Sequence, residues 1–353
     1  MPDALPVTMR AVVIHEHGGP DKLTYHTDYP TPVPGPGEVV VKVRYCGLNF
    51  LDIFVREGMP GEPVRLPTIT GGDVSGDIAA IGEGVNPALL GQAVVMNPSW
   101  SCGVCEYCLD GDTQICVGDS HMLGEGADGA MAEYVKAPAR NAIPLPDGVP
   151  YEIAACLPVA WGTAHRMLFD RAKLRMGENL LVLAAAGGVG TGCVQLGKMA
   201  GARVFAAAST EDKLQKLREL GADEVVNYVT DPDWDRTLRS LTNKRGMDVV
   251  IDNNGASTWE KSIRVLGKRG RLVSTGATSG PIGPTDIRYL FRREHNILGS
   301  NGWRQKDIVA CLNGVQQGKL RPLIHKIYPL EEARAAEEAL ASREVMGKVL
   351  IKP

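Results

Sequence analysis

The chain has 353 residues, of which 44% are hydrophobic and 22% charged, enough apolar surface for two ordinary domain cores. Its formal net charge of -3 gives no reason to expect nucleic acid or an anionic membrane as a partner, so a small-molecule substrate is expected instead. The first residues lack a signal-peptide pattern and no stretch is apolar enough to span a membrane, which makes the cytoplasm the expected location.

Short apolar runs separated by glycine and proline turns occupy the chain from Arg10 to about Ile143. The runs are AVVI, EVVVKV, VSGDIAAIG, QAVVM and AEYV. This pattern predicts a β-rich domain.

Four cysteines interrupt that domain within fifteen residues, in the stretch CGVCEYCLDGDTQIC at Cys102, Cys105, Cys108 and Cys116. A reducing compartment favours metal ligation over disulfides, and four thiolates at this spacing suit a tetrahedral zinc ion. A redox pair or unrelated thiols are the alternative. A closed shell of four sulfurs leaves no position for water or substrate, so the expected zinc is structural.

From about Tyr151 the pattern changes to strands that alternate with helical segments, for example LLVLAAAGGVG, RVFAAAS, EDKLQKLRELGA and MDVVIDNNG. This alternation is typical of a doubly wound parallel sheet. After about Gly299 the sequence is mostly helical until MGKVLIKP, which reads as a closing strand.

A glycine-rich turn follows the first strand of that second part. Ala185, Gly187 and Gly190 have the spacing of G-x-G-x-x-G with alanine in first place, and Gly188 and Val189 complete the turn. Such a turn lets the backbone and a helix N-terminus approach a pyrophosphate. A glycine-rich turn without a ligand is the alternative, but the strand before it and the helix after it favour dinucleotide binding.

The end of the next strand indicates which dinucleotide is preferred. NAD enzymes usually carry a carboxylate at the end of this strand, where this chain has Ala208. Ser209 and Lys213 could hold the extra phosphate of NADPH. Alternatively, Lys213 is a solvated charge on the following helix. The pattern favours NADPH.

Together these motifs resemble the medium-chain dehydrogenase/reductase superfamily, from MRAVVIHEHGGP through PGPGEVVVKV, the cysteine lobe, DGAMAEYV and AAAGGVG to MGKVLIKP. The resemblance implies an α/β fold with a GroES-like catalytic domain over residues 1–155 that carries the zinc lobe (102–116). It further implies a Rossmann domain over 156–299 and a C-terminal segment, 300–353, that returns to the catalytic domain. A homo-oligomer, dimer or tetramer, is also implied.

The three positions that bind catalytic zinc in the zinc-dependent members hold Asn49, Gly72 and Val159 here. Asp52 and Asp73 match the carboxylates that accompany that metal. The pattern GLNFLD resembles the quinone-oxidoreductase branch, whose members lack catalytic zinc and reduce quinones, enones or enoyl thioesters with NADPH. We therefore expect an NADPH-dependent reductase with one structural zinc.

In that branch, residues matching Asn49 and Asp52 line the nicotinamide pocket. Asn49 is the expected donor to the substrate carbonyl, where charge grows as an enolate forms, and Asp52 is its expected partner. A scaffold role is the alternative, with Asn49 capping the helix that contains Asp52.

The same branch implies further cofactor contacts, with Tyr228 and Arg343 at the 2′-phosphate and Thr163 near the nicotinamide. Two other functions stay open: an alcohol dehydrogenase with unconventional zinc ligands, and a nonenzymatic dinucleotide-binding protein.

Overall fold

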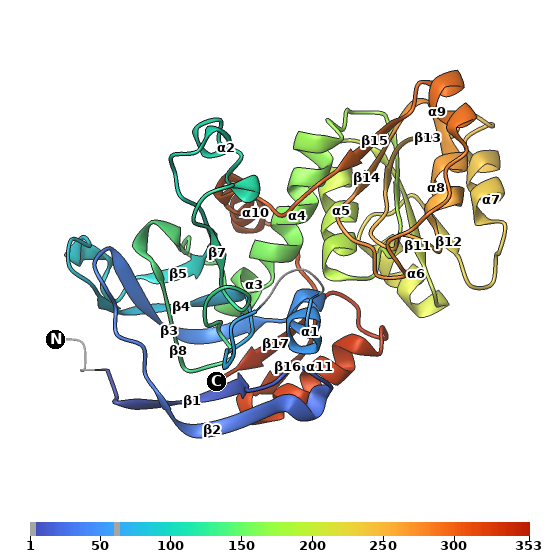
Figure 1. The fold of residues 1–353 in the computed structure, drawn as a ribbon. Coiled ribbons are helices and arrows are strands. Elements are labelled where there is room, and N and C mark those ends of the chain that lie inside the picture. The colour runs from blue at the N-terminus through green and yellow to red at the C-terminus, as the bar shows by residue number, and fades with distance from the viewer. Residues whose placement is uncertain (1–4, 60–63) are drawn as a thin grey trace. The chain divides into compact units, whose positions relative to one another are not determined.

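The computed structural model describes residues 5–59 and 64–353, which fold as two compact units (Figure 1). Unit 1 comprises Met1–Val159, Arg304–Gln317 and Pro322–Pro353, and unit 2 comprises Ala160–Trp303 and Gly318–Arg321. The first boundary therefore follows Val159 instead of residue 155. The chain leaves unit 2 at Trp303 and returns to it once more for a short piece.

Unit 1 is built mainly of strands. They are β1 (Thr8–Ile14), β2 (Leu23–Pro30), β3 (Glu38–Gly47), β4 (Asp73–Ile81), β5 (Ala93–Met96), β6 (Ser99–Trp100), β7 (His121–Met122), β8 (Tyr134–Pro138), β9 (Ala142–Pro144), β16 (Ile324–Pro329) and β17 (Lys348–Lys352). The helices are α1 (Phe50–Glu57), α2 (Glu106–Leu109), α3 (Tyr151–Ala154), α10 (Gln305–Gln316) and α11 (Ala333–Ala341), with short 3-10 turns η1 (Pro20–Lys22), η2 (Pro87–Leu89), η3 (Thr113–Ile115), η4 (Ala139–Asn141) and η7 (Leu330–Glu332).

The central sheet of unit 1 has the order β16-β17-β3-β4-β5-β9, and β8 also pairs with β3. The C-terminal strand β17 runs antiparallel to β3, with Leu350 opposite Gly47, so the last strand of the chain lies beside a strand from its N-terminal part (Figure 1). The parallel neighbour β16 was not predicted, because its sequence IHKIYP buries only Tyr328 and lacks a strand-like apolar run. The pairing of β17 with β3 brings Lys348, the first residue of β17, beside the loop that follows β3.

Unit 2 is a doubly wound α/β domain, which confirms the predicted fold class. Its strands are β10 (Asn179–Val182), β11 (Arg203–Ala208), β12 (Glu224–Asn227), β13 (Met247–Ile251), β14 (Leu266–Ser274) and β15 (Asn296–Gly299). Its helices are α4 (Gly162–His165), α5 (Gly188–Met199), α6 (Glu211–Glu219), α7 (Trp234–Leu241), α8 (Trp259–Val265) and α9 (Ile287–Arg293), with a π-helical turn at η6 (Arg166–Arg171). A second π-helical turn, η5 (Leu157–Trp161), contains the boundary between the two units.

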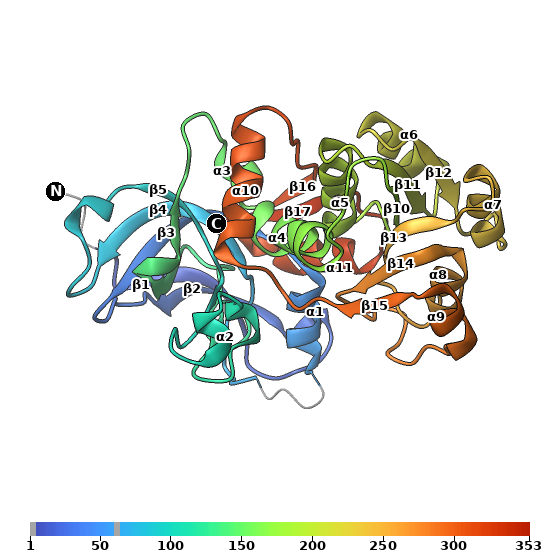
Figure 2. The ribbon, with the colours of Figure 1, turned by 90° about the horizontal axis from the view of Figure 1, so that it is seen from above.

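The sheet of unit 2 is parallel throughout and has the order β12-β11-β10-β13-β14-β15. Helices α5 and α6 lie on one face, and α8 and α9 lie on the other (Figure 2). The strand order reverses between β10 and β13, and in such sheets ligands bind beyond the carboxyl ends of the strands at this reversal.

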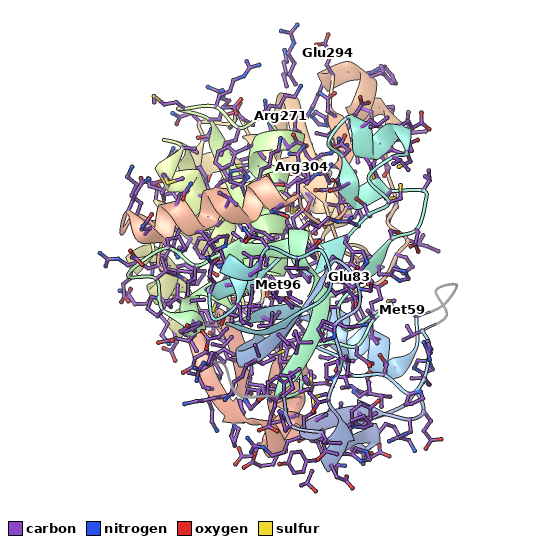
Figure 3. The ribbon with its side chains drawn as sticks, turned by 90° about the vertical axis from the view of Figure 1, so that its left-hand side faces the viewer. Met59, Glu83, Met96, Arg271, Glu294 and Arg304 are labelled. Carbon is purple, nitrogen blue, oxygen red and sulfur yellow. The ribbon has the colours of Figure 1, made fainter. Side chains whose placement is uncertain are left out.

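Apolar side chains fill the cores of the two units, whereas most charged side chains stay exposed. Met96 of β5 is fully buried inside unit 1, whereas Glu294, which follows α9 in unit 2, is exposed (Figure 3). Among the described residues, no helix is both long and apolar enough to cross a membrane.

Candidate active site and metal centre

The four cysteine sulfurs of the lobe lie within 4.8 Å of one another, and none of the four forms a disulfide. The Sγ–Sγ distances are 3.4 Å for Cys105 and Cys108, 3.5 Å for Cys102 and Cys116, and 3.9 Å for Cys102 and Cys108. A tetrahedral zinc ion with bonds of about 2.3 Å separates its sulfurs by about 3.8 Å. The donor set therefore fits zinc in both chemistry and spacing.

Backbone N–H groups point at these sulfurs. Cys102 and Gly118 donate to Cys116 Sγ at 3.4 and 3.3 Å, and Cys105 donates to Cys102 Sγ at 3.4 Å. Donors of this kind favour the thiolate form that a metal requires.

Polar contacts fasten the lobe to the rest of unit 1. Arg304, at the start of α10 (Figure 3), contacts Asp112 Oδ1 through Nη1 at 3.4 Å. Arg140 Nη2 donates to the carbonyl of Ser101, where the lobe begins, at 2.9 Å. The lobe is an appendage of unit 1 and contributes no strand to either large sheet.

The positions expected to bind catalytic zinc converge on one buried carboxylate, that of Asp73. Its Oδ1 accepts from the backbone N–H of Val159 at 2.7 Å, and its Oδ2 accepts from Asn49 Nδ2 at 3.0 Å. Gly72, adjacent to Asp73, offers no side chain. Within residues 5–59 and 64–353, the lobe cysteines are the one group of three or more histidine, cysteine or acidic side chains spaced to hold a metal.

An ammonium group occupies this region, and the sequence patterns did not single it out. Lys348, at the start of β17, is 3% exposed. Its Nζ donates to the Leu48 carbonyl at 2.7 Å and to Asn49 Oδ1 and Asp73 Oδ2 at 2.8 Å each. A fixed positive charge therefore stands at the amide of Asn49.

The predicted partnership between Asn49 and Asp52 differs from the observed one. Asp52 Oδ2 accepts from the backbone N–H of Asn49 at 2.7 Å, and its Oδ1 accepts from Gly71 N–H at 3.0 Å. Asp52 thus satisfies the N-terminus of α1 and does not contact the Asn49 amide. The carboxylate at that amide is Asp73, because the side chain of Asn49 points toward β4 and away from the first turn of α1.

The Asn49 amide makes three contacts of unequal length. Besides those to Asp73 and Lys348, Nδ2 donates to the Gly47 carbonyl at 3.3 Å. The hydrogen bond to Gly47 is the longest of the three, so the Nδ2 hydrogen that makes it is the one that a substrate oxygen could most readily accept. The role of Asn49 as a carbonyl donor stays a prediction.

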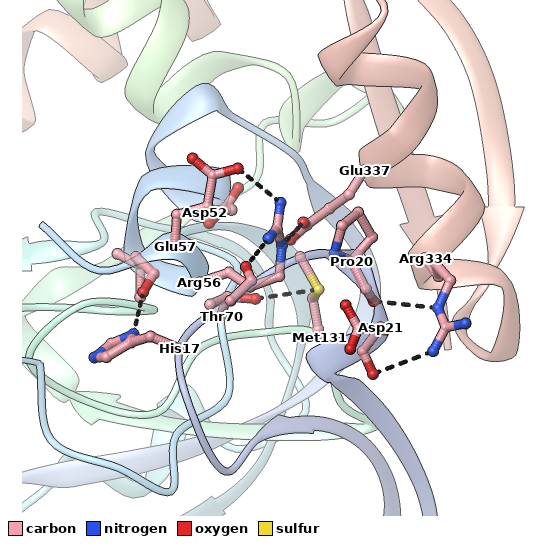
Figure 4. Close-up of polar contacts among 12 residues, drawn as sticks. His17, Pro20, Asp21, Asp52, Arg56, Glu57, Thr70, Met131, Arg334 and Glu337 are labelled. Atoms are coloured by element: carbon pink, nitrogen blue, oxygen red, sulfur yellow. Dashed lines mark hydrogen bonds and ion pairs between the residues drawn. The ribbon is translucent and has the colours of Figure 1, made fainter.

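A buried ion pair between Arg56 and Glu337 lies close enough to Asp52 to affect its charge (Figure 4). Arg56 Nε donates to Glu337 Oε2 at 2.6 Å, and Arg56 Nη1 donates to the Gly18 carbonyl. The pKa of Asp52 is raised to about 7, chiefly by burial and also by the negative charge of Glu337, while the backbone N–H of Asn49 acts to lower it. Asp52 therefore sits close to its titration point at neutral pH.

In unit 2, the glycine-rich turn joins β10 to α5 in the predicted place. Gly187 caps the N-terminus of α5. A Cβ on Gly187 would meet only Ala184 O at 3.7 Å, whereas one on Gly190 would lie 2.5 Å from that oxygen and 2.6 Å from Ala185 Cα. The first N–H groups of α5, including those of Gly188 and Val189, have no acceptor within the helix, as an anion site requires.

This difference predicts separate effects of two alanine substitutions. Gly190→Ala should destabilise unit 2 by about 1–3 kcal/mol, because its methyl group would push α5 off the strand end. Gly187→Ala should leave thermal stability unchanged and weaken NADPH binding, because its methyl group points into open space where a pyrophosphate would approach. Thermal unfolding and fluorescence titration with NADPH measure the two effects, and equal stability of the two variants would contradict the packing argument.

Three of the predicted cofactor residues gather at the carboxyl ends of adjacent strands. Ser209 follows β11, Lys213 lies in the first turn of α6, and Tyr228 follows β12 with its N–H donating to Ala208 O at 3.2 Å. The nearby carboxylate of Glu211 accepts from Asn227 Nδ2 at 3.2 Å. The structure thus brings Ser209, Lys213 and Tyr228 together.

The remaining two predicted residues lie elsewhere in the chain. Thr163 is buried in α4 of unit 2. Arg343 belongs to unit 1, after α11, with a left-handed backbone at φ 61°. Their cofactor contacts stay predictions.

Comparison with known proteins adds independent findings. Residues 35–147 match the alcohol dehydrogenase GroES-like domain, and residues 188–315 match the zinc-binding dehydrogenase domain. The chain is 30% identical to a quinone oxidoreductase of Lama guanicoe over 97% of each protein, and 29% identical to an acryloyl-coenzyme A reductase of Sulfurisphaera tokodaii over 98% of this chain and all of the relative. A solved NAD-dependent alcohol dehydrogenase is similar with 41% identity and a TM-score of 0.93, over 98% of this chain and all of that one.

Proposed function

The chain belongs to the medium-chain dehydrogenase/reductase superfamily, and we propose that it is an NADPH-dependent reductase of quinones or activated carbon–carbon double bonds that has one structural zinc and no catalytic metal. The observation that carries the proposal is the substitution of all three metal-ligand positions, at Asn49, Gly72 and Val159. Lys348 forms an ion pair with Asp73, the carboxylate beside these positions.

The chemistry suits a site without a metal. When bound, NADPH supplies a hydride to the β-carbon of the acceptor, the double-bond electrons move to the carbonyl oxygen as an enolate, and a proton from water completes the product. Charge on an enolate oxygen is stabilised by preorganised hydrogen-bond donors, and the Asn49 amide is the proposed donor. The names of the quinone oxidoreductase and the acryloyl-coenzyme A reductase support this class of acceptor.

A substrate panel tests this function. We expect the purified protein to oxidise NADPH in the presence of at least one quinone, enone or enoyl thioester, and not to oxidise simple alcohols. The similarity to a solved NAD-dependent alcohol dehydrogenase favours the opposite result, so primary and secondary alcohols with NAD⁺ and NADP⁺ belong in the same panel. Alcohol oxidation without any reduction of the other acceptors would contradict the proposal, and cofactor binding without any turnover would favour a nonenzymatic role.

Cofactor preference follows from the ends of β11 and β12. We expect NADPH to bind more tightly than NADH, because Ala208 replaces the usual carboxylate and Lys213 offers a cation. Lys213→Ala should reduce the preference for NADPH, expressed as the ratio of the two dissociation constants, about tenfold or more, which is the effect of losing one charge-assisted phosphate contact. Ala208→Asp should favour NADH. Fluorescence titration of each variant with both cofactors checks this, and equal affinities in the wild type would refute it.

Unit 2 also offers an edge for self-association, and we propose a homodimer formed there. Among the described residues, β15 pairs with β14 alone, and Ile287, Phe291 and Ile297 nearby are 69%, 66% and 37% exposed. An exposed strand edge flanked by apolar side chains is a template for pairing with an identical strand. Light scattering should give twice the chain mass, falling toward one chain mass in Ile297→Lys. A monomeric wild type would contradict it.

A further inference from the structure

Lys348 stands out among the buried charged groups because its nitrogen reaches a residue of the proposed chemistry. All three of its hydrogen bonds are accounted for, by the Leu48 carbonyl, Asn49 Oδ1 and Asp73 Oδ2. The bond to Asn49 Oδ1, at 2.8 Å, comes from a cation to the carbonyl end of an amide.

We propose that Lys348 is a positioning residue that holds and polarises the Asn49 amide, so that the positive charge of its ammonium reaches the substrate oxygen through Asn49. This inference deepens the proposed function and rests on it, since it concerns the donor for the same reduction. The fold supplies this positive charge from the C-terminal strand β17.

Physical reasons support the polarisation. A hydrogen bond accepted at the oxygen of an amide draws electron density from its nitrogen, and linked hydrogen bonds strengthen one another in a low-dielectric interior. Lys348 and Asp73 are 3% and 0% exposed in their side chains, so solvent does not screen this charge. The Nδ2 hydrogen that now faces Gly47 at 3.3 Å would therefore be a stronger donor than an amide without this cation.

Asp73 completes the arrangement and fixes which way the amide faces. Its Oδ2 accepts from Lys348 Nζ and from Asn49 Nδ2, so the oxygen of Asn49 must face the ammonium and its nitrogen must face the carboxylate. Rotating the amide by half a turn would place its oxygen against Asp73 and its nitrogen against the ammonium, both repulsive. The orientation is therefore unique.

The test distinguishes the effect of Lys348 on turnover from the effect of Asp73 and from a loss of folding stability. Removing one member of a buried ion pair is strongly destabilising, whereas neutralising both is often tolerated. We therefore compare Asp73→Asn with the double variant Lys348→Met/Asp73→Asn at a temperature at which thermal unfolding shows both to be folded. The matched control is Arg271→Met/Glu178→Gln, an ion pair of unit 2 whose side chains are each 17% exposed.

With the best acceptor of the panel, the double variant should turn over about tenfold more slowly than Asp73→Asn, the effect of losing the charge-assisted hydrogen bond to the Asn49 amide. NADPH affinity should not change, and the control pair should keep wild-type turnover within about threefold. Equal turnover of Asp73→Asn and the double variant would overturn the proposal.

A second measurement does not depend on activity. In protein labelled with ¹⁵N in its asparagine side chains, the Asn49 signal, identified by its loss in Asn49→Ala, should differ between Asp73→Asn and the double variant and should not move in the control pair. An unmoved signal overturns the polarisation. A moved signal in a protein that reduces no acceptor would uphold the role of Lys348 and refute the proposed reductase function instead.

Discussion

Replacing Cys105 by serine is expected to release the zinc ion and to unfold the lobe from Ser101 to Val117, while the dinucleotide-binding fold of unit 2 persists. Structural zinc sites in small peptides contribute on the order of 10–16 kcal/mol of binding free energy, so the loss of one of four ligands is a large effect. The lobe holds few buried apolar groups to replace it, since Val104 and Leu109 are each 75% exposed. Metal analysis, thermal unfolding and proteolysis of the lobe measure the outcome.

The matched control is Cys156→Ser, outside the lobe. The Cys156 thiol donates to the Glu152 carbonyl at 3.2 Å, a hydrogen bond that a serine hydroxyl can reproduce. This variant should retain zinc and an intact lobe. If zinc-depleted protein kept its full thermal stability, or if Cys105→Ser still bound one zinc ion per chain tightly, the structural-zinc account would be wrong.

Replacing Asn49 by alanine is expected to lower turnover about 10²–10³-fold, the usual effect of losing one preorganised donor to a developing negative charge. NADPH affinity should be little changed. The cap of α1 should survive, because Asp52 accepts from the backbone N–H of Asn49, which alanine retains. Steady-state kinetics, NADPH titration and thermal unfolding together distinguish a donor from a scaffold residue.

Asn141→Ala is the matched control for that experiment. Asn141 is a buried asparagine of the same unit, and its Nδ2 donates to the carbonyl groups of Asn97 and Ser99 at 2.8 and 2.9 Å. We expect it to lower the melting temperature and to leave turnover near that of the wild type. Near-normal turnover in Asn49→Ala, with a lowered melting temperature, would identify Asn49 as scaffold.

Features encoded by neighbouring residues were predictable from the sequence. The cysteine lobe and the turn at Gly187 each depend on a short stretch whose spacing is itself the signal, and the structure places both as expected. The strands β3, β4 and β5 coincide with the apolar runs from which they were predicted. In these cases local geometry already limits what the chain can do.

Features that depend on distant pairing were not predictable in the same way. Lys348 reaches Asn49 across 299 positions of the sequence, through the pairing of β17 with β3, and a single lysine in MGKVLIKP carries no signal of that contact. The carboxylate that contacts the Asn49 side chain was not predicted, for a related reason. Proximity in sequence suggested Asp52, whereas the strand pairing of β3 with β4 supplies Asp73.

The number of zinc ions in the active protein tests the central claim most directly, because the account assigns one metal site to the lobe and none to the region of Asn49, Asp73 and Lys348. Metal analysis of purified protein, with reductase turnover measured on the same sample, should give one zinc ion per chain. Two zinc ions per chain, with turnover lost when the more weakly held ion is removed, would contradict it.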